Sequence, residues 1–241
     1  MLKNWGRKHF YFFLWTEHII FAQKLQFMSI IPFDKIKLYR MTHIANIPHI
    51  LLHGITSKSS RNANPDYVSI GDSSLIANRE HTSLTVNNKD VNIGNYIPFY
   101  FWLKMPMLYV IQHGYNYVPN PVKAEDIVYI VVSLTDLTSS GKEYYFTDGH
   151  AKDKLSKVYD ATAIKDIENI LDWDAIRAEK WSGDGIDTEV KRKKQAEFLY
   201  SDDIKPELIV GYACYNELAK NKLTTFGVQE SLIKIFPKFY Y

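Results

Sequence analysis

The sequence has few of the features that would place it in a specialised class. Its 241 residues include one cysteine, Cys214, so neither an intramolecular disulfide nor a cysteine-based zinc site can form. We therefore expect a reducing compartment, the cytoplasm. Basic and acidic residues nearly balance, 29 against 27, which argues against a protein that coats nucleic acid by bulk charge.

Several familiar chemical signatures are also absent. Neither a GxxxxGK phosphate loop nor a GxGxxG dinucleotide fingerprint occurs, and no GxSxG nucleophile accompanies Asp148, Gly149 and His150, which we interpret as a turn. His49 and His53 lie four positions apart, but the pair lacks the Glu of HExxH and a third ligand. This spacing therefore favours ordinary helix-face histidines over a zinc site.

Residues 1–27 differ from the rest of the chain. They hold four positive charges and one negative charge, so residues 28–241 have a formal charge of −1. Thr16, Glu17 and His18 interrupt the apolar run, which is too short for a membrane span, and no small-residue cleavage site follows it. We prefer an extension outside the fold, with Met28 as an alternative start, over a membrane or signal segment. The segment is rich in aromatic residues: Trp5, Phe10, Tyr11, Phe12, Phe13, Trp15, Phe21 and Phe27.

Residues 28–241 contain no internal repeat or long linker, which predicts one domain. Strands and helices do not alternate regularly, so we expect an α+β fold. The apolar run IVYIVVSL predicts a strand buried on both faces. The expected elements are a helix over 47–53 capped by Asn46 and ended by Gly54, a long loop over 56–95, strands over 127–134, 195–200 and 208–214, and a helix over 164–170 continuing towards Trp173, Ile176 and Trp181.

The segment KRKKQAEFL, residues 191–199, joins four cations to a short strand. Strand alternation would put Gln195 and Glu197 side by side on one face, about 6.5–7 Å apart. A carboxylate there can accept a hydrogen bond from a sugar hydroxyl and stabilise positive charge on the adjacent ring carbon, as glycosidic cleavage requires. The alternative is a solvated cationic turn before an edge strand with a surface glutamate.

Five segments, in order along the chain, resemble the DarT family of DNA ADP-ribosyltransferase toxins. The resemblance runs from about residue 28 to residue 214, which supports the interpretation of residues 1–27 as an extension. The segments are YRMTHIANI (39–47), YIPFYF with MPMLY (96–101, 105–109), FTDGHA (146–151), DWDAI continuing to Trp181 (172–181) and RKKQAEFL (192–199).

The resemblance implies an ADP-ribosyltransferase fold, a single α+β domain with a central split mixed β-sheet. It implies a pentosyl-transferring glycosyltransferase that uses NAD as donor substrate, without a metal, and modifies a base of single-stranded DNA, thymine in preference to guanine. Such an enzyme would act as a toxin or phage-defence effector, away from membranes, with a DarG-like macrodomain antitoxin as partner.

The same resemblance implies roles for single residues. Glu197 matches the catalytic glutamate, and Arg79 matches the catalytic arginine and would also bind NAD. Many members have His where this chain has Arg40. The remaining NAD-binding residues would be Tyr39, Arg40, Met41, Thr42, His43, Asn46 and Gly54, and the DNA-binding residues His150, Lys191, Arg192, Lys193 and Lys194.

Alternatives stay open at this level. Glu80 can hold Arg79 in a surface ion pair, and a guanidinium keeps its proton in proteins, which favours an electrostatic role for Arg79 over base catalysis. His43 fits an NAD contact or a core histidine equally, and the aromatic residues of 96–101 favour core and pocket wall over a base-stacking platform. The whole chain also fits a transferase that acts on protein or RNA, or a silent DNA-binding module.

Overall fold

An apolar strand, β5 (Ile127–Ser133), lies inside the structure, with six of its seven residues buried. The structure, a computed structural model, describes residues 31–115, 118 and 120–241, and Pro32 to Tyr241 form one compact unit. The expected strand over 127–134 is confirmed except for Leu134, which begins helix α5 (Leu134–Thr138). The predicted extension, residues 1–27, lies outside the described residues.

Of the other strands, β1 (Lys37–His43) is as long as β5, with seven residues, and the rest are shorter. The shorter strands are β2 (Ser83–Val86), β3 (Lys89–Asn92), β4 (Ile97–Tyr100), β6 (Tyr144–Thr147), β7 (Val158–Tyr159), β8 (Glu197–Tyr200), β9 (Ile209–Cys214) and β10 (Ile233–Ile235). The remaining helices are α2 (Ile47–His53), α3 (Ser73–Arg79), α4 (Pro106–His113), α6 (Ile167–Ile170), α7 (Trp173–Arg177), α8 (Thr188–Lys193) and α9 (Glu217–Thr225).

Eight of the described strands form one sheet in the order β10-β9-β5-β1-β4-β8-β6-β7, and β2 and β3 form a separate hairpin. The sheet is mixed because β9 and β10 run parallel while the other pairs are antiparallel. Its two halves meet at β1 and β4, which share a single register pair, Tyr39 with Tyr100. The predicted α+β fold with a split mixed sheet is therefore confirmed. No helix within the described ranges is both long and apolar enough to cross a membrane.

Helix α2 has the predicted bounds, but Asn46 does not cap it with its side chain. Asn46 has helical backbone angles, and its amide bonds Thr42 and Val68 instead. Gly54 ends the helix as expected, with φ of +77°, and a Cβ there would overlap the carbonyl of Ile204. The Gly54 position thus lets the chain pass close to residue 204, where Ile55 forms a β-bridge with Ile204.

The prediction of a loop over 56–95 is wrong in its second half, which folds into α3, β2 and β3. The Asp72 carboxylate accepts hydrogen bonds from the N–H groups of Ser74 and Leu75 and so caps α3. Asn87 and Asn88 both have positive φ, the conformation of a two-residue hairpin turn, and Asn tolerates it. Both signals are local and lie in the polar stretch itself.

Two further expectations need correction near residues 164–200. The helix expected from Ile164 towards Trp181 is broken at Leu171, whose backbone is extended, and Asp172 caps the separate helix α7. The basic run lies in and after helix α8 rather than in a turn, and β8 begins at Glu197 rather than at residue 195. Gln195 therefore does not stand beside Glu197 on a strand; its amide donates to the carbonyl of Lys191.

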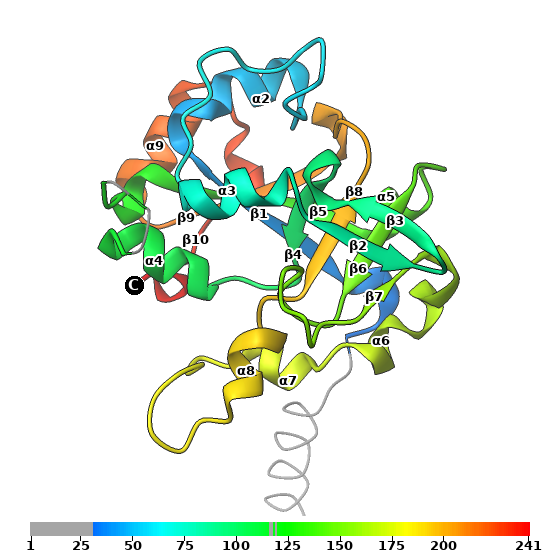
Figure 1. Ribbon diagram of the computed structural model, residues 1–241. Helices are drawn as coiled ribbons and strands as arrows, with labels where there is room; N and C mark the ends of the chain where they lie inside the picture. Colours follow the sequence, from blue (N-terminus) through cyan, green and yellow to red (C-terminus); the bar gives the residue numbers. More distant parts are fainter. Residues whose placement is uncertain (1–30, 116–117, 119) are drawn as a thin grey trace, which may run out of the picture. The chain divides into compact units, whose positions relative to one another are not determined.

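The C-terminus is anchored in the core. Leu108 and Ile111 of α4 belong to one buried cluster with Ile127 and Tyr129 of β5. Each fully buried side chain of this size stabilises the fold by about 1.5–3 kcal/mol. The Tyr240 hydroxyl, in the same cluster, lies within hydrogen-bond distance of the carbonyls of Ile127 and Ala213, 3.1 and 3.2 Å away. The last residues of the chain are thereby held against α4, at the left of Figure 1.

Candidate active site

Strand register brings two candidate residues, Tyr39 and Glu197, into one row with Tyr100. Tyr39 of β1 lies opposite Tyr100 of β4, and Tyr100 lies opposite Glu197 of β8. Directly opposite residues of antiparallel strands point to the same face, so the three side chains share one face of the sheet. The row crosses the junction between the two halves of the sheet, where the β1–β4 pairing is shortest.

Glu197 is buried, with 1% of its surface exposed, at the first position of β8. Its Oε1 accepts a hydrogen bond from the Ala151 N–H (3.1 Å), and its own N–H donates to the Thr147 hydroxyl (3.0 Å). That hydroxyl donates in turn to the Gly149 carbonyl (2.6 Å). The turn that follows β6 therefore fixes the carboxylate from one side.

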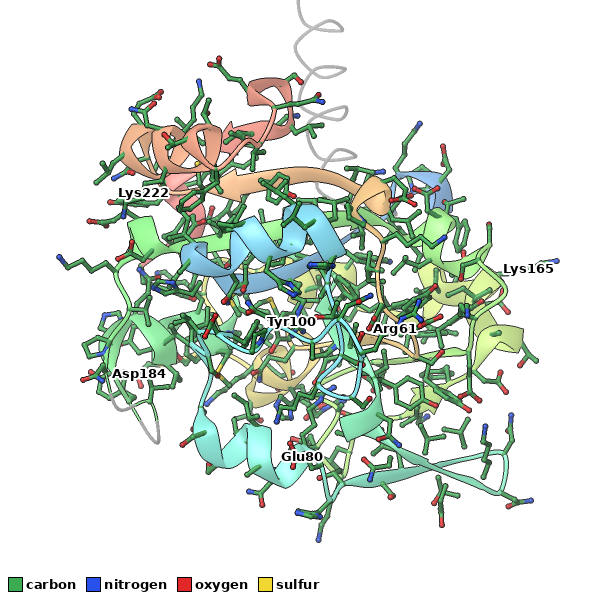
Figure 2. All side chains as sticks on the ribbon, turned by 90° about the horizontal axis from the view of Figure 1, so that it is seen from above. Arg61, Glu80, Tyr100, Lys165, Asp184 and Lys222 are labelled. Carbon is green, nitrogen blue, oxygen red and sulfur yellow. The ribbon has the colours of Figure 1, made fainter. Side chains whose placement is uncertain are left out.

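Arg79, the last residue of α3, approaches the same carboxylate. Its Nη2 lies 2.7 Å from Glu197 Oε2. Figure 1 shows α3 in front of β1, and Figure 2 shows Tyr100 near the middle of the view, with Glu80, the residue after Arg79, towards its edge. Glu80 pairs with Lys58 on the surface and leaves Arg79 to Glu197. The alternative of a surface pair between Arg79 and Glu80 is therefore not the one the structure adopts.

The ion pair decides the protonation state of the carboxylate. Burial alone would raise the pKa of Glu197, but the close charge of Arg79, the charge of His150 and the hydrogen bond from Ala151 hold it below its ordinary value. Burial lowers the pKa of His150, with Glu197 opposing and Arg79 assisting this shift. Burial, followed by the charge of Glu197, raises the pKa of Tyr100. At neutral pH the site thus contains a carboxylate, a guanidinium, a neutral imidazole and a protonated phenol.

Some polar atoms of the pair are left without hydrogen bonds. Glu197 Oε2, Arg79 Nε and Arg79 Nη2 are buried and have no hydrogen-bond partner among the described residues, although Nη2 and Oε2 form the ion pair. Buried polar atoms in proteins are nearly always satisfied, so such atoms call for an explanation. A ligand with hydroxyl or phosphate oxygens would supply both an acceptor for Arg79 and a donor for Glu197.

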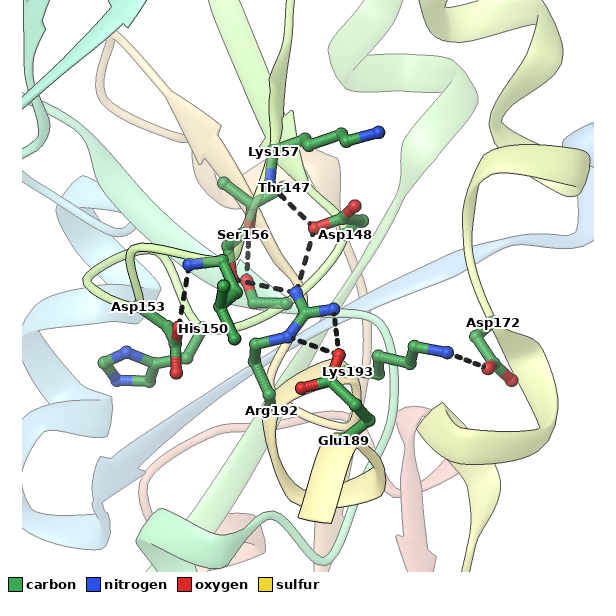
Figure 3. Close-up of polar contacts among 12 residues, drawn as sticks. Thr147, Asp148, His150, Asp153, Ser156, Lys157, Asp172, Glu189, Arg192 and Lys193 are labelled. Atoms are coloured by element: carbon green, nitrogen blue, oxygen red, sulfur yellow. Dashed lines mark hydrogen bonds and ion pairs between the residues drawn. The ribbon is translucent and has the colours of Figure 1, made fainter. Parts of the chain in front are cut away.

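Arg192 holds the turn that contacts Glu197 (Figure 3). Its Nη1 donates to Asp148 Oδ1 (3.2 Å) and to Ser156 Oγ (3.1 Å), and its Nη2 donates to Glu189 Oε2 (2.7 Å). A Cβ at Gly149 would collide with this guanidinium unless the Arg192 side chain shifted, so glycine lets the turn pack closely against Arg192. Arg192 is therefore a positioning residue for the 147–156 turn.

Comparison with known proteins shows that the chain matches a protein family. The family described as "ssDNA thymidine ADP-ribosyltransferase, DarT" matches residues 39–241. The chain belongs to the DarT family. The resemblance stated for the five motifs is thus confirmed, and so is the prediction that the chain is a DNA ADP-ribosyltransferase.

Curated relatives and solved structures agree with this membership. The chain is 29% identical over 202 residues to a DNA ADP-ribosyl transferase of Escherichia coli O127:H6, covering 83% of this chain and 89% of that one. It is 30% identical over 206 residues to one of Thermus aquaticus, covering 83% and 82%. A Thermosipho africanus relative, 29% identical over 194 residues, is a "DNA ADP-ribosyl transferase-DNA ADP-ribosyl glycohydrolase fusion protein", and the match covers 77% of this chain and 44% of that one.

Two solved structures of Thermus sp. 2.9 DarT share the fold at 25% sequence identity. The complex with ADP-ribosylated single-stranded DNA has a TM-score of 0.72 and covers 85% of this chain and 96% of that one. The complex with NAD+ has a TM-score of 0.67 and covers 85% and 97%. The fold of this DarT chain is therefore that of proteins captured with donor and with modified acceptor.

Five of the predicted NAD-binding residues of this DarT chain lie on β1. Tyr39, Arg40, Met41, Thr42 and His43 are consecutive strand residues. Arg40 donates to the carbonyl of Pro98 (3.0 Å) on β4 and so crosses the junction between the two halves of the sheet. Burial is the main reason that the pKa of His43 is lowered, and its Nδ1 accepts from the Ala45 N–H.

Three of the predicted NAD ligands have structural contacts of their own. The buried Asn46 amide donates to the Thr42 hydroxyl and the Val68 carbonyl and accepts from the Val68 N–H, each at 2.9 Å. This clasp holds the segment before α3 against β1. Gly54 is explained by its close approach to Ile204. Thr42, Asn46 and Gly54 therefore have structural reasons to be where they are, whatever their contact with a ligand.

The four cations of the basic run have different environments. Lys191 is exposed and lies over the Trp181 ring, 5.5 Å from its centroid. Arg192 contacts Asp148, Ser156 and Glu189. Lys193 pairs with Asp172 at 2.9 Å. Lys194 is buried and donates to the carbonyl of Ile176 (2.9 Å). A DNA contact by Lys194 is at odds with this burial, and the run does not form the continuous basic stripe expected from sequence.

We expect Lys194→Met to stabilise the protein. Burial, with the nearby charge of Lys104, lowers the pKa of Lys194 to about 8. The charged form is therefore disfavoured in the folded state: the penalty is complete below about pH 8, and wild-type stability recovers as pH rises towards the ordinary lysine value of about 10.4. After allowing for the lost bond to Ile176, the variant should gain about 1–2 kcal/mol at pH 7. Urea unfolding at pH 7 and pH 9.5 measures this; a loss of stability at both pH values would contradict it.

Sequence reasoning missed several members of the site. Tyr100, Thr147 and the Ala151 N–H lie within the recognised segments, but only the strand register and the turn after β6 bring them to Glu197. Within the described ranges, no group of three His, Cys, Asp or Glu side chains is arranged to hold a metal ion. His49 and His53 lie with ring centroids 4.6 Å apart on α2, without a third ligand there.

Proposed function

We propose that this DarT-family chain transfers ADP-ribose from NAD+ to a thymine base of single-stranded DNA, with Glu197 and Arg79 at the reacting bond. The observation that carries the proposal is the buried ion pair whose Oε2 and Nε atoms lack hydrogen-bond partners. Support for donor and acceptor comes from Thermus sp. 2.9 DarT, which shares the fold and was captured with NAD+ and with ADP-ribosylated single-stranded DNA.

In this proposal Glu197 acts on the ribose of the donor. Its ionised Oε2 accepts a hydrogen bond from a ribose hydroxyl and stabilises positive charge on C1′ as the bond to the nicotinamide nitrogen breaks. Nicotinamide leaves with the bonding electron pair and becomes neutral. The preformed contacts from Ala151 and Thr147 mean that little reorganisation is needed when this charge develops.

In this proposal Arg79 and His150 contact the donor diphosphate and the base. Arg79 stays protonated and stabilises the donor diphosphate and negative charge on the base. In thymidine the ring nitrogen N3 carries a proton, which passes to solvent as N3 forms its bond to C1′. His150 Nδ1 accepts from the Lys152 N–H, so the neutral ring carries its proton on Nε2 and can donate to a thymine carbonyl. The roles of Tyr39 to His43 as the donor-binding strand remain part of this proposal.

The target base is tested with matched oligonucleotides. We expect the purified chain to label a single-stranded oligonucleotide containing one thymine and to leave the same oligonucleotide with cytosine at that position unlabelled. Nucleoside digestion and mass spectrometry should then find ADP-ribose on thymidine. Labelling of guanosine, or equal labelling of both oligonucleotides, would overturn the assignment of thymine while leaving the transferase activity itself intact.

We also propose that the activity is toxic to a cell and is reversed by a partner enzyme. A base carrying ADP-ribose on its pairing edge blocks replication, and both substrates are present in the cytoplasm. Support for a partner that removes the modification comes from the Thermosipho africanus relative, in which a DNA ADP-ribosyl glycohydrolase is fused to the transferase. A macrodomain antitoxin encoded beside this chain remains a prediction.

A further inference from the structure

The aromatic residues of the segment 96–101 favour core and pocket wall over a base-stacking platform, and two of them do lie in the core. Phe99 and Phe101 expose 0% and 1% of their surfaces. A different group of rings lies at the surface, and we call it the outer aromatic cluster. It consists of Tyr109, His113, Tyr115, Trp181 and Tyr241.

Three rings of the outer aromatic cluster stack nearly parallel. The His113 ring lies 4.1 Å from that of Tyr109 and 5.8 Å from that of Tyr115, centroid to centroid, at interplanar angles of 29° and 6°. Tyr115 is 50% exposed. An exposed stack of flat rings is the surface on which bases of a single strand stack, whatever their sequence.

The other two rings are fixed by hydrogen bonds. Trp181 Nε1 donates to the Tyr241 hydroxyl (2.6 Å), which donates to the carbonyl of Lys104 (3.3 Å). The Tyr109 ring meets both Trp181 and Tyr241 edge to face. The loop between α7 and α8, the end of α4 and the C-terminus are therefore held together, as Figure 1 also shows for α4 and the C-terminus. A rigid surface loses little entropy when it binds a ligand.

Two lysines accompany these rings, and neither ammonium takes part in an ion pair within the described part of the chain. Lys104 Nζ lies 5.0 Å from the centroid of the Tyr241 ring, and Lys191 Nζ lies 5.5 Å from that of Trp181. This distinguishes Lys191 from Lys193 and Arg192, which carboxylates neutralise. Cations beside stacking rings are the combination that binds the backbone and bases of a single strand.

The backbone conformation of Lys104 is of a kind that is common at functional sites. Its φ is +55°, a left-handed conformation that costs a non-glycine residue about 1 kcal/mol or more. Two tyrosines hold it: the Lys104 N–H donates to the Tyr129 hydroxyl (3.1 Å), and its carbonyl accepts from Tyr241. Strained residues that the surroundings fix in this way are concentrated at binding and catalytic sites.

We propose that the outer aromatic cluster, with Lys104 and Lys191, binds a nucleotide of single-stranded DNA that flanks the target base. The cluster is connected to the active site by two short segments of chain: Lys104 follows Tyr100 by four positions, and Lys191 precedes Glu197 by six. A flanking base stacks on the face of Tyr115 and His113, and the two ammonium groups contact neighbouring phosphates. The inference rests on the proposed function, because it extends the path of the same acceptor strand.

Oligonucleotide length separates this contact from the catalytic pocket. With Tyr115→Ala we expect KM for a long thymine-containing strand to rise about tenfold, with kcat unchanged. KM for a strand too short to leave the pocket should stay the same. Tyr115→Phe, which keeps the ring, should resemble wild type, and Phe226→Ala removes a comparably exposed aromatic side chain outside the cluster. Unchanged KM for the long strand in Tyr115→Ala would overturn the inference.

The lysines are tested by salt dependence. Lys191→Gln and Lys104→Gly, which tolerates the positive φ, should each reduce the slope of log Kd against log salt by about 0.7 for single-stranded DNA, whereas Tyr115→Ala should weaken binding without changing the slope. Slopes equal to wild type in both lysine variants would show that neither lysine contacts a phosphate. If wild type labels no DNA at all, the proposed function fails; if it labels DNA and these variants do not differ from it, only the outer contact fails.

Discussion

Replacing Glu197 by Gln should reduce ADP-ribose transfer by about a thousandfold. The substitution keeps the size of the side chain but removes the negative charge that opposes the positive charge developing on the ribose, and removing one such electrostatic group costs roughly 10²–10³ in rate. The measurement is the rate of incorporation of labelled ADP-ribose into a thymine-containing single strand at saturating NAD+. Cells that express the variant should grow, whereas cells that express wild type should not.

The matched control is Glu207→Gln, an exposed glutamate that lies outside the site. It should transfer at the wild-type rate. Thermal unfolding of both variants checks that the fold is intact, because the Glu197→Gln substitution leaves Arg79 without its counter-charge. Full activity in a folded Glu197→Gln protein would show that the carboxylate is not part of the reaction.

Replacing Arg79 by Met should both inactivate and destabilise the protein. Glu197 is almost fully buried, and without Arg79 its charge has no opposite partner within ion-pair distance in the described part of the chain. Breaking a buried pair by removing one partner costs about 3–5 kcal/mol, and water that reaches the partly exposed Arg79 position places the expected loss near the lower end. Urea unfolding at pH 7 measures the free energy of unfolding.

The pH dependence of stability and a double variant test whether the unpaired charge of Glu197 causes the loss of stability in Arg79→Met. In wild type the depressed pKa of Glu197 contributes stability above its ordinary value of about 4.5, and this contribution is lost as pH falls through the folded value. In Arg79→Met the pKa of Glu197 should instead be raised, so the difference from wild type should grow from pH 4 to pH 7. Arg79→Met with Glu197→Gln should recover most of the loss. An additive double variant would show that the two side chains do not interact.

The sequence predicted the fold well where the signals were local. The run 127–133 is apolar at nearly every position, which is sufficient to identify a buried strand, and Pro48 and Gly54 mark the bounds of α2. The hairpin of β2 and β3 was missed although Asn87 and Asn88 carry its turn signal, because polar composition over 56–95 outweighed it. The motif resemblance, rather than periodicity, located Glu197 and Arg79.

The contacts of the site could not be read from sequence because their partners are far apart along the chain. Arg79 and Glu197 are separated by 118 positions, and nothing local favours Glu197 over the adjacent Glu80 as the partner of Arg79. The basic run presents the same difficulty. Its cations look free in sequence, yet Asp148 and Asp172 neutralise two of them and burial removes a third. Only tertiary structure leaves Lys191 as the exposed member with an aromatic neighbour.

The most direct test of the account is an acceptor comparison with labelled NAD+. Wild type and Glu197→Gln are each mixed with single-stranded DNA, the corresponding duplex, RNA of the same sequence and an unrelated protein, and the label on each acceptor is counted. The account predicts label on single-stranded DNA with wild type and background with Glu197→Gln. Label chiefly on RNA or protein, or label on DNA that survives the loss of the Glu197 carboxylate, would contradict it.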